Sequence, residues 1–158
     1  MSTTMPGGDA RWLTADEERA WRAFLRVMVA VRTGMARDLA ALDLSEPDYE
    51  VLSTLSEHPG HTCTLGEQAD KMGWSRSRLS RHATRMEARG LLRRAPDPAD
   101  GRGCLLVLTE HGLAVLGSAA PAHVASVRHH FIDRLAPDDL AAIERIARRL
   151  DEPGSLDA

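Results

Sequence analysis

Apolar residues recur at three- and four-residue steps from Trp21 to Leu42 near the start of the chain. Because this period matches one face of an α-helix, the pattern predicts a long amphipathic helix over residues 15–42. Thr14 and Glu17 have the spacing of a capping box at its start. A small globular core cannot cover a helix of this length, so its apolar stripe is expected to pack against a partner.

The middle of the chain contains three shorter helical patterns, each with start and stop signals. They begin after Ser45, Thr64 and Ser75, and they end near residue 58, at Gly73 and near Arg89. A short extended piece, His61–Cys63, precedes the second of them. Two short helices joined by a tight glycine turn predict a helix-turn-helix over residues 64–89.

Two β-prone runs follow the helix-turn-helix, Leu91–Ala95 and Leu105–Thr109. The residues between them, 96–103, are rich in proline, aspartate and glycine, which favours a turn. The pattern predicts a β-hairpin with a projecting loop, here called the wing. A helix capped by Thr109 and a last helix beginning at Pro137 complete the predicted elements.

The expected fold class is mainly α with a small β-hairpin wing: a winged helix-turn-helix with N- and C-terminal dimerisation helices. Residues 44–110 are expected to form the winged helix-turn-helix lobe. The helical dimerisation region is expected over residues 13–43 and 111–152. Residues 1–12 and 153–158 read as flexible tails.

The charge is distributed unevenly along the chain, whose net charge is −3. Residues 71–94 contain eight basic side chains and one acid, a local charge of +7 that leaves −10 for the rest. A compact basic block of this kind is typical of a nucleic-acid contact surface. The acidic remainder counts against a non-specific architectural protein that coats DNA, which is the alternative binding class.

Composition excludes several other classes. The chain is 43% hydrophobic and 27% charged over 158 residues, as in ordinary globular proteins, and it contains two cysteines. No apolar run is long enough to cross a membrane. Without a signal-like start, the chain is expected in the reducing cytoplasm. No catalytic motif is present, so an enzyme is not expected, and neither is a cofactor.

A helical projection of residues 75–89 separates two faces. Leu79, Ala83 and Met86 form the edge expected to be buried. The opposite side carries short hydroxyl side chains interleaved with arginines, which suits a helix placed against bases and phosphates. An arginine-rich solvated face is the alternative, but it would leave the neighbouring glycine turn and hairpin as coincidences.

Five segments in this order and spacing resemble MarR-type (multiple antibiotic resistance regulator) transcriptional regulators. They are residues 64–69, 75–81, 89–94, 97–102 and 108–112, and the resemblance covers about residues 12–151. It implies an obligate homodimer of winged helix-turn-helix subunits that binds double-stranded DNA at a palindromic operator. It also implies repression relieved by a small-molecule effector or by thiol oxidation.

The resemblance assigns DNA-binding roles residue by residue. The recognition-helix role is assigned to Ser75, Arg76, Ser77, Arg78, Ser80 and Arg81. Arg102 corresponds to the wing arginine that enters the minor groove, and Asp100 to the aspartate that fixes an arginine. Thr64 and Ser75 are candidate phosphate contacts through their backbone amides. Arg85 is a candidate for phosphate or an internal salt bridge, whereas Arg89, Arg93 and Arg94 are expected to be solvated surface.

Three sensing mechanisms remain open. Cys63 and Cys104, beside the outer strands of the predicted sheet, are candidates for a redox switch, but small structural residues are the simpler interpretation. The seven histidines lack the converging spacing that zinc requires, which makes a zinc-responsive regulator a weak alternative. An organic effector is expected in the crevice between the dimerisation helices and the DNA-binding lobe, with Tyr49, Trp21 and Trp12 as candidate lining groups.

Overall fold

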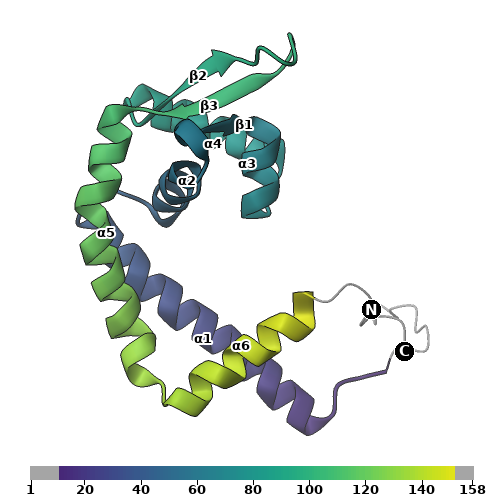
Figure 1. The fold of residues 1–158 in the computed structure, drawn as a ribbon. Helices are drawn as coiled ribbons and strands as arrows, with labels where there is room; N and C mark the ends of the chain where they lie inside the picture. Colours follow the sequence, from purple (N-terminus) through teal and green to yellow (C-terminus); the bar gives the residue numbers. More distant parts are fainter. Residues whose placement is uncertain (1–10, 152–158) are drawn as a thin grey trace, which may run out of the picture.

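The computed structural model describes residues 11–151, which form a C-shaped molecule (Figure 1). A winged lobe lies at one end, and the long helices α1 and α5 extend from it to the other end, where α6 lies (Figure 1). Apart from residues 11 and 12, the two predicted tails lie outside the described residues. The predicted fold class, mainly α with a small wing, is confirmed.

The described residues contain six α-helices and three β-strands. The helices are α1 (Ala15–Ala40), α2 (Glu46–Ser56), α3 (Leu65–Met72), α4 (Arg76–Ala88), α5 (Glu110–His130) and α6 (Pro137–Asp151). The strands are β1 (Thr62–Thr64), β2 (Leu92–Pro96) and β3 (Cys104–Leu108). The 3-10 turns η1 (Pro59–His61) and η2 (Ile132–Arg134) precede β1 and α6.

Side-chain caps define where most of these helices begin. Thr14 and Thr64 form the capping boxes that their spacing predicts, since each side chain and the acid three residues later bond reciprocally. The C-terminus of α1 comes two residues earlier than predicted. There the Leu44 amide donates to the Leu39 carbonyl oxygen at 3.1 Å, and Asp43 adopts a left-handed φ of 56°.

The three strands form an antiparallel sheet in the order β1-β3-β2. Cys63 of β1 faces Leu106 across the ladder, and Leu92 of β2 faces Leu108. The expectation that Cys104 lies beside an outer strand is wrong, because β1 pairs with the far side of β3. Cys104 therefore lies on the central strand, and Cys63 lies on an edge strand.

The core of the lobe lies between α2, α4 and the sheet. Leu79, Ala83 and Met86 of α4 are fully buried, as the helical projection predicts, and they share this core with Leu52 and Leu106. Gly73 ends α3 with a φ of 63°, a conformation that favours glycine over residues with a Cβ atom. Helix α4 is therefore held by one face in the core and leaves the other face open.

The long helices α1 and α5 pack against each other away from the lobe. Ser126 of α5 donates to Asp38 Oδ2 of α1 at 2.6 Å, and His130 Nε2 lies 2.9 Å from the same oxygen. These hydrogen bonds, Ser126 foremost, lower the pKa of Asp38 below its ordinary value. None of the helices between residues 11 and 151 is long and apolar enough to span a membrane.

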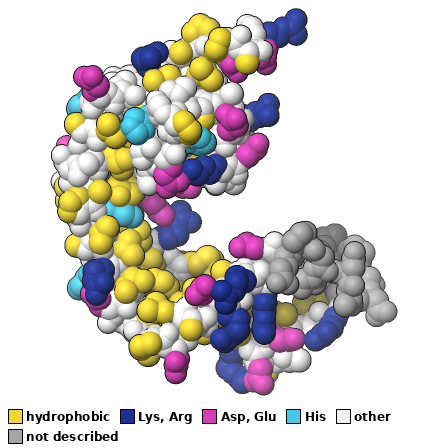
Figure 2. All heavy atoms as spheres, in the orientation of Figure 1, with side chains coloured by type: hydrophobic (Ala, Val, Ile, Leu, Met, Phe, Trp, Pro, Cys, Tyr) yellow, Lys and Arg dark blue, Asp and Glu magenta, His cyan; other side chains and the backbone are white. Residues whose placement is uncertain are grey.

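Large apolar side chains remain exposed along α1 and α6. On α6 they are Leu140, Ile143, Ile146 and Leu150, and on α1 they include Trp21, Phe24, Leu25, Val27, Met28 and Val29. Figure 2 shows hydrophobic side chains spread over this half of the molecule. An apolar surface of this extent marks an interaction site rather than a solvated face.

Candidate nucleic-acid interface

The open face of α4 carries most of the residues predicted to contact DNA. Ser75 caps the helix, its Oγ accepting from the Arg78 amide at 3.2 Å. Ser75, Arg76, Ser77, Arg78, Arg81 and Arg85 are exposed, whereas Ser80 is half-buried on the side facing β2. Figure 1 places α4 beneath the wing, within the same lobe.

The N-terminus of α4 differs from those of the other helices in its charge. The first turns of α1, α2, α3, α5 and α6 all carry acidic side chains. The first turn of α4 carries none and contains Arg76 and Arg78 instead. The partial positive charge of this helix end is therefore left uncompensated, which suits an approach to phosphate.

One flank of α4 forms a groove with the wing. Thr64, Arg76, Asp100 and Arg102 line this space of about 330 Å³. A Cβ atom at Gly66 would lie only 3.0 Å from Arg76 Nη2, so the absence of a side chain there lets the Arg76 guanidinium lie against α3. The predicted wing arginine and the first recognition-helix arginine thus share one groove.

Hydrogen bonds within the wing loop fix its backbone. Asp100 Oδ1 accepts from the Arg102 amide at 3.0 Å, and the Gly103 amide donates to the Asp100 carbonyl oxygen at 2.7 Å. Of the two partners that the resemblance implied for Asp100, Arg102 or a recognition-helix arginine, the structure pairs it with the backbone of Arg102. The Arg102 side chain is exposed and forms no ion pair with the described residues.

The other flank of α4 presents three arginines beside an aromatic ring. The Arg78 guanidinium lies 3.7 Å from the centroid of the Trp74 ring, a cation–π contact that restricts its position. Trp74, Arg78, Arg81 and Arg85 line a groove of about 270 Å³ here. The role of Trp74 was not anticipated from the sequence, although its four-residue spacing from Arg78 is the signal that could have shown it.

A buried polar network lies behind this flank and holds Arg85. Asp48 Oδ1 of α2 lies 2.9 Å from His82 Nε2, and the Arg89 Nη1 donates to Asp48 Oδ2 at 2.8 Å. Arg85 Nη2 lies 2.9 Å from His82 Nδ1. Because a guanidinium can only donate, His82 Nδ1 must accept, which places the imidazole proton on Nε2, facing Asp48.

The pKa of Asp48 reports on the strength of this network. Burial alone would raise the pKa of this carboxyl group, but hydrogen bonds from His82, the Ser45 amide and Arg89 outweigh it. The pKa of Asp48 consequently lies well below its ordinary value. The carboxylate is therefore charged and fully engaged at neutral pH.

Two arginines that were expected to be solvated surface are structural instead. Arg89 also donates to the Asp43 carbonyl oxygen, which ties the end of α4 to the loop before α2. Arg94 of β2 donates to Glu87 Oε2 at 2.8 Å and to the Ser80 carbonyl oxygen at 2.7 Å. Arg94 thereby links the wing to the recognition helix. Only Arg93 of the three is exposed without such contacts.

The Thr64 backbone amide, a candidate phosphate contact, already donates a hydrogen bond within the protein. That amide donates to Glu67 Oε2 at 2.8 Å, because Glu67 completes the capping box of α3. The Thr64 amide is therefore already engaged within the capping box, and a phosphate contact through it would have to replace Glu67. Thr64 also lines the groove that Arg76 and Arg102 share.

Comparison with known proteins decides the family. A sequence model of the MarR family matches residues 42–103. AbsC, a MarR family transcriptional regulator from Streptomyces coelicolor, is 44% identical with a TM-score of 0.83, and the match covers 89% of this chain and 98% of AbsC. The chain belongs to the MarR family.

Two further relatives are similar to this MarR-family chain. Sco3205, a MarR family transcriptional regulator from Streptomyces coelicolor whose structure is a complex with DNA, is 34% identical with a TM-score of 0.84. That match covers 88% of this chain and 91% of Sco3205. The transcriptional regulator HosA of Escherichia coli O111:H- is 33% identical over 109 residues, which are 68% of this chain and 78% of HosA.

Replacing Asp48 with asparagine is expected to destabilise this MarR-family protein by about 1–3 kcal/mol, because His82, the Ser45 amide and Arg89 lose a buried charged acceptor. The pKa of Asp48 is depressed in the folded state, so its stabilisation is present above pH about 4 and is lost as the pH falls further. Urea unfolding of the wild-type protein and the Asp48→Asn variant between pH 7 and 3 measures the difference in their free energies of unfolding. Equal stabilities at pH 7 would contradict the role of Asp48.

The candidate effector residues fall in two separate places. Tyr49 lines a pocket of about 250 Å³ between α1, α2 and α5, as expected for the crevice beside the lobe. Trp12 and Trp21 line a different groove near the start of α1, together with Leu13 and Leu25. Trp12 and Trp21 are therefore not part of the Tyr49 pocket, because α1 carries them toward its opposite end.

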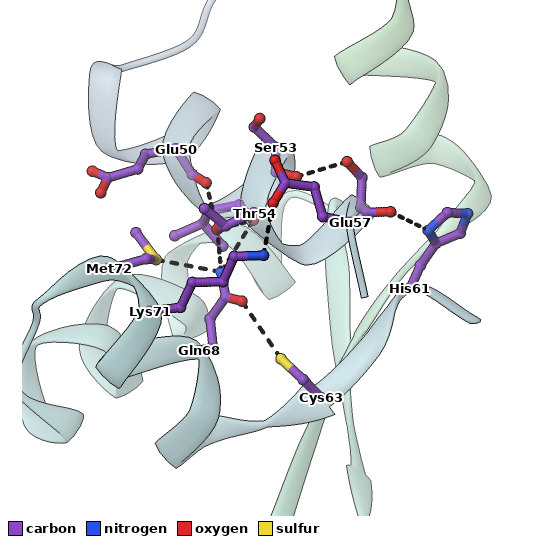
Figure 3. A network of polar contacts seen from close by, with 11 residues as sticks. Glu50, Ser53, Thr54, Glu57, His61, Cys63, Gln68, Lys71 and Met72 are labelled. Atoms are coloured by element: carbon purple, nitrogen blue, oxygen red, sulfur yellow. Dashed lines mark hydrogen bonds and ion pairs between the residues drawn. The ribbon is translucent and has the colours of Figure 1, made fainter. Parts of the chain in front are cut away.

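Cys63 takes part in a structural contact inside the lobe. Cys63 is buried and its Sγ donates to Gln68 Oε1 at 3.5 Å (Figure 3). Burial raises the pKa of the Cys63 thiol to about 11, which disfavours the thiolate needed for a redox switch. Within residues 11–151, no three His, Cys, Asp or Glu side chains are grouped so that they could hold a metal ion.

Proposed function

We propose that this MarR-family regulator is a homodimeric repressor that binds a palindromic operator in double-stranded DNA. The observation that carries the proposal is the exposed serine–arginine face of α4, flanked on one side by the groove that Arg76 and Arg102 share. In this arrangement α4 enters the major groove and its first two turns approach the base edges. Arg102 on the wing reaches the adjacent minor groove, where a narrow groove attracts arginine.

The homodimer is supported by the apolar surface of the helices outside the lobe. Ile143 and Ile146 of α6 are 41% and 52% exposed, and Trp21 and Phe24 of α1 are each 52% exposed. A second copy of the chain buries these side chains if the two sets of α1 and α6 pack together. Two-fold symmetry then presents two recognition helices to the two halves of a palindrome.

A non-specific architectural DNA-binding protein is the alternative, and two observations count against it. Residues 71–94 carry a net charge of +7, whereas the rest of the chain carries −10. In addition, Ser77 and Arg81 lie on the exposed face of α4, where short hydroxyls permit close approach and arginine can bind a guanine edge. Non-specific coating requires phosphate contacts only.

A small-molecule effector is proposed to bind the Tyr49 pocket. This pocket touches both α2 of the DNA-binding lobe and the α1–α5 pair, so an occupant contacts both parts of the molecule at once. An occupant that fits only one arrangement of these parts shifts the spacing of the two recognition helices and relieves repression.

Selection of bound fragments from genomic DNA, followed by footprinting, tests the proposed function. The expected result is one palindromic motif whose half-sites are about one helical turn apart, protected by the protein near a promoter. Purified protein is then expected to lower transcription from that promoter. An absence of any enriched motif would leave only the architectural alternative.

A further inference from the structure

The pocket between α1, α2 and α5 is lined by both apolar and aromatic side chains. Met35 and Leu39 of α1 supply an apolar wall. Tyr49 and His123, which also line the pocket, form a stacked pair, with ring centroids 4.0 Å apart and an angle of 29° between the planes. With a volume of about 250 Å³, the space accommodates a single small aromatic molecule.

The charged groups that line this pocket are all acidic. Glu46 and Glu50 of α2 contribute carboxylates, and neither lysine nor arginine is among the described lining residues. Arg32 lies outside the lining and pairs with Glu46 at 3.4 Å, whereas Arg78 is engaged with Trp74. An anionic ligand in this pocket would therefore face two carboxylates, because the cations that act on Glu50, Arg78 and Arg32, lie outside the lining and are held by Trp74 and Glu46.

The remaining polar groups also favour a donor on the ligand. His123 Nδ1 is buried and has no hydrogen-bond partner among the described residues. Burial lowers the pKa of His123, so the ring is neutral at neutral pH and one ring nitrogen can accept a hydrogen bond. Burial likewise raises the pKa of Glu50, and the charges of Arg78 and Arg32 offset this only in part, so its charged form gains from a further cation placed beside it.

We propose that this pocket binds a small planar aromatic ligand carrying a cationic N–H donor group, such as an amidine or an amine, and discriminates against aromatic carboxylates. The ring stacks on the Tyr49–His123 pair, and the donor group points toward Glu50 and Glu46. This inference rests on the proposed effector site and specifies the chemistry of the ligand that the site accepts.

The wall of this pocket is tied directly to the helix-turn-helix. Thr54 lines the pocket, and its Oγ1 accepts from Gln68 Nε2 of α3 at 2.5 Å (Figure 3). Thr54 Oγ1 also donates to the Glu50 carbonyl oxygen at 2.7 Å. Gln68 is fully buried, so a ligand that displaces Glu50 or Thr54 disturbs the contact between α2 and α3. Occupancy of the pocket is thereby transmitted to the helix that precedes α4.

Three probes of nearly equal size and shape test the ligand class: benzamidine, benzamide and benzoate, which are cationic, neutral and anionic. Calorimetric titration of the full-length protein is expected to show benzamidine binding about tenfold more tightly than benzoate, with benzamide between them. Glu50→Gln and Glu46→Gln are each expected to reduce this preference several-fold. Glu144→Gln, which removes an exposed carboxylate on α6, is the control and should leave it unchanged.

The inference would be overturned if benzoate bound as tightly as benzamidine. It would also be overturned if Glu50→Gln left the preference for benzamidine intact, or if none of the three probes bound at millimolar concentration. Operator binding by the unliganded protein, measured in parallel, reports separately on the proposed function. Intact operator binding without any probe preference overturns the ligand class alone. A retained probe preference without operator binding supports the ligand class and overturns the proposed repressor.

Discussion

Replacing Arg81 with alanine is expected to weaken binding to the operator by about 1–3 kcal/mol and to relax the preference for one base in each half-site. Arg81 lies on the exposed face of α4 in its second turn, where a recognition helix approaches base edges. A bidentate contact to guanine is the interaction lost. Affinities for a library of single-base operator variants measure both effects.

Two other arginines provide contrasting controls in the same library. Arg102→Ala is expected to reduce affinity at the operator flanks and keep the central preference, because the wing loop places Arg102 beside α4 rather than on it. Arg85→Ala is expected to weaken all sequences alike if Arg85 contacts phosphate. If the Arg81→Ala variant also loses affinity equally for operator and random DNA, Arg81 contacts only the DNA backbone and not the bases.

Introducing aspartates at Ile143 and Ile146 together is expected to separate the proposed dimer and to lower operator affinity by at least about 100-fold. Both side chains are exposed on α6, so the change removes apolar contact with a second copy without disturbing the core of the chain. Two linked half-site contacts then become two independent ones, and the gain from bivalent binding is lost.

Light scattering measures this change directly. The wild-type protein should have about twice the 17.3 kDa mass of one chain at micromolar concentration, and the double variant should have the mass of one chain. Glu144→Gln, on the same helix, is the control. A wild-type mass of one chain would contradict the dimer whether or not the variant folds.

Local signals explain why so much of the fold could be predicted from the sequence. Thr14, Thr64 and Thr109 each cap a helix through a contact only three residues away, so spacing alone locates these starts. The buried edge of α4 is likewise a local property of its periodicity. The resemblance to a family added the DNA-binding roles assigned to α4 and to Arg102 of the wing.

Contacts between distant residues explain what the sequence could not show. Arg89 is engaged by Asp48, which lies 41 residues away, and nothing near Arg89 distinguishes it from the solvated Arg93. The misassignment of Arg94 has the same origin, since its partners Ser80 and Glu87 are brought close only when β2 packs against α4. The separation of Trp21 from Tyr49 depends on the direction of α1, which the pattern of apolar residues does not specify.

The affinity of the purified protein for its selected palindrome, relative to a scrambled duplex of the same composition, tests the proposed function most directly. At about 150 mM salt, where non-specific phosphate binding is weakened, this ratio is expected to reach at least about 1,000, with two chains bound per duplex. A ratio near one, or a single chain per duplex at saturation, would contradict a dimeric protein that reads sequence through α4.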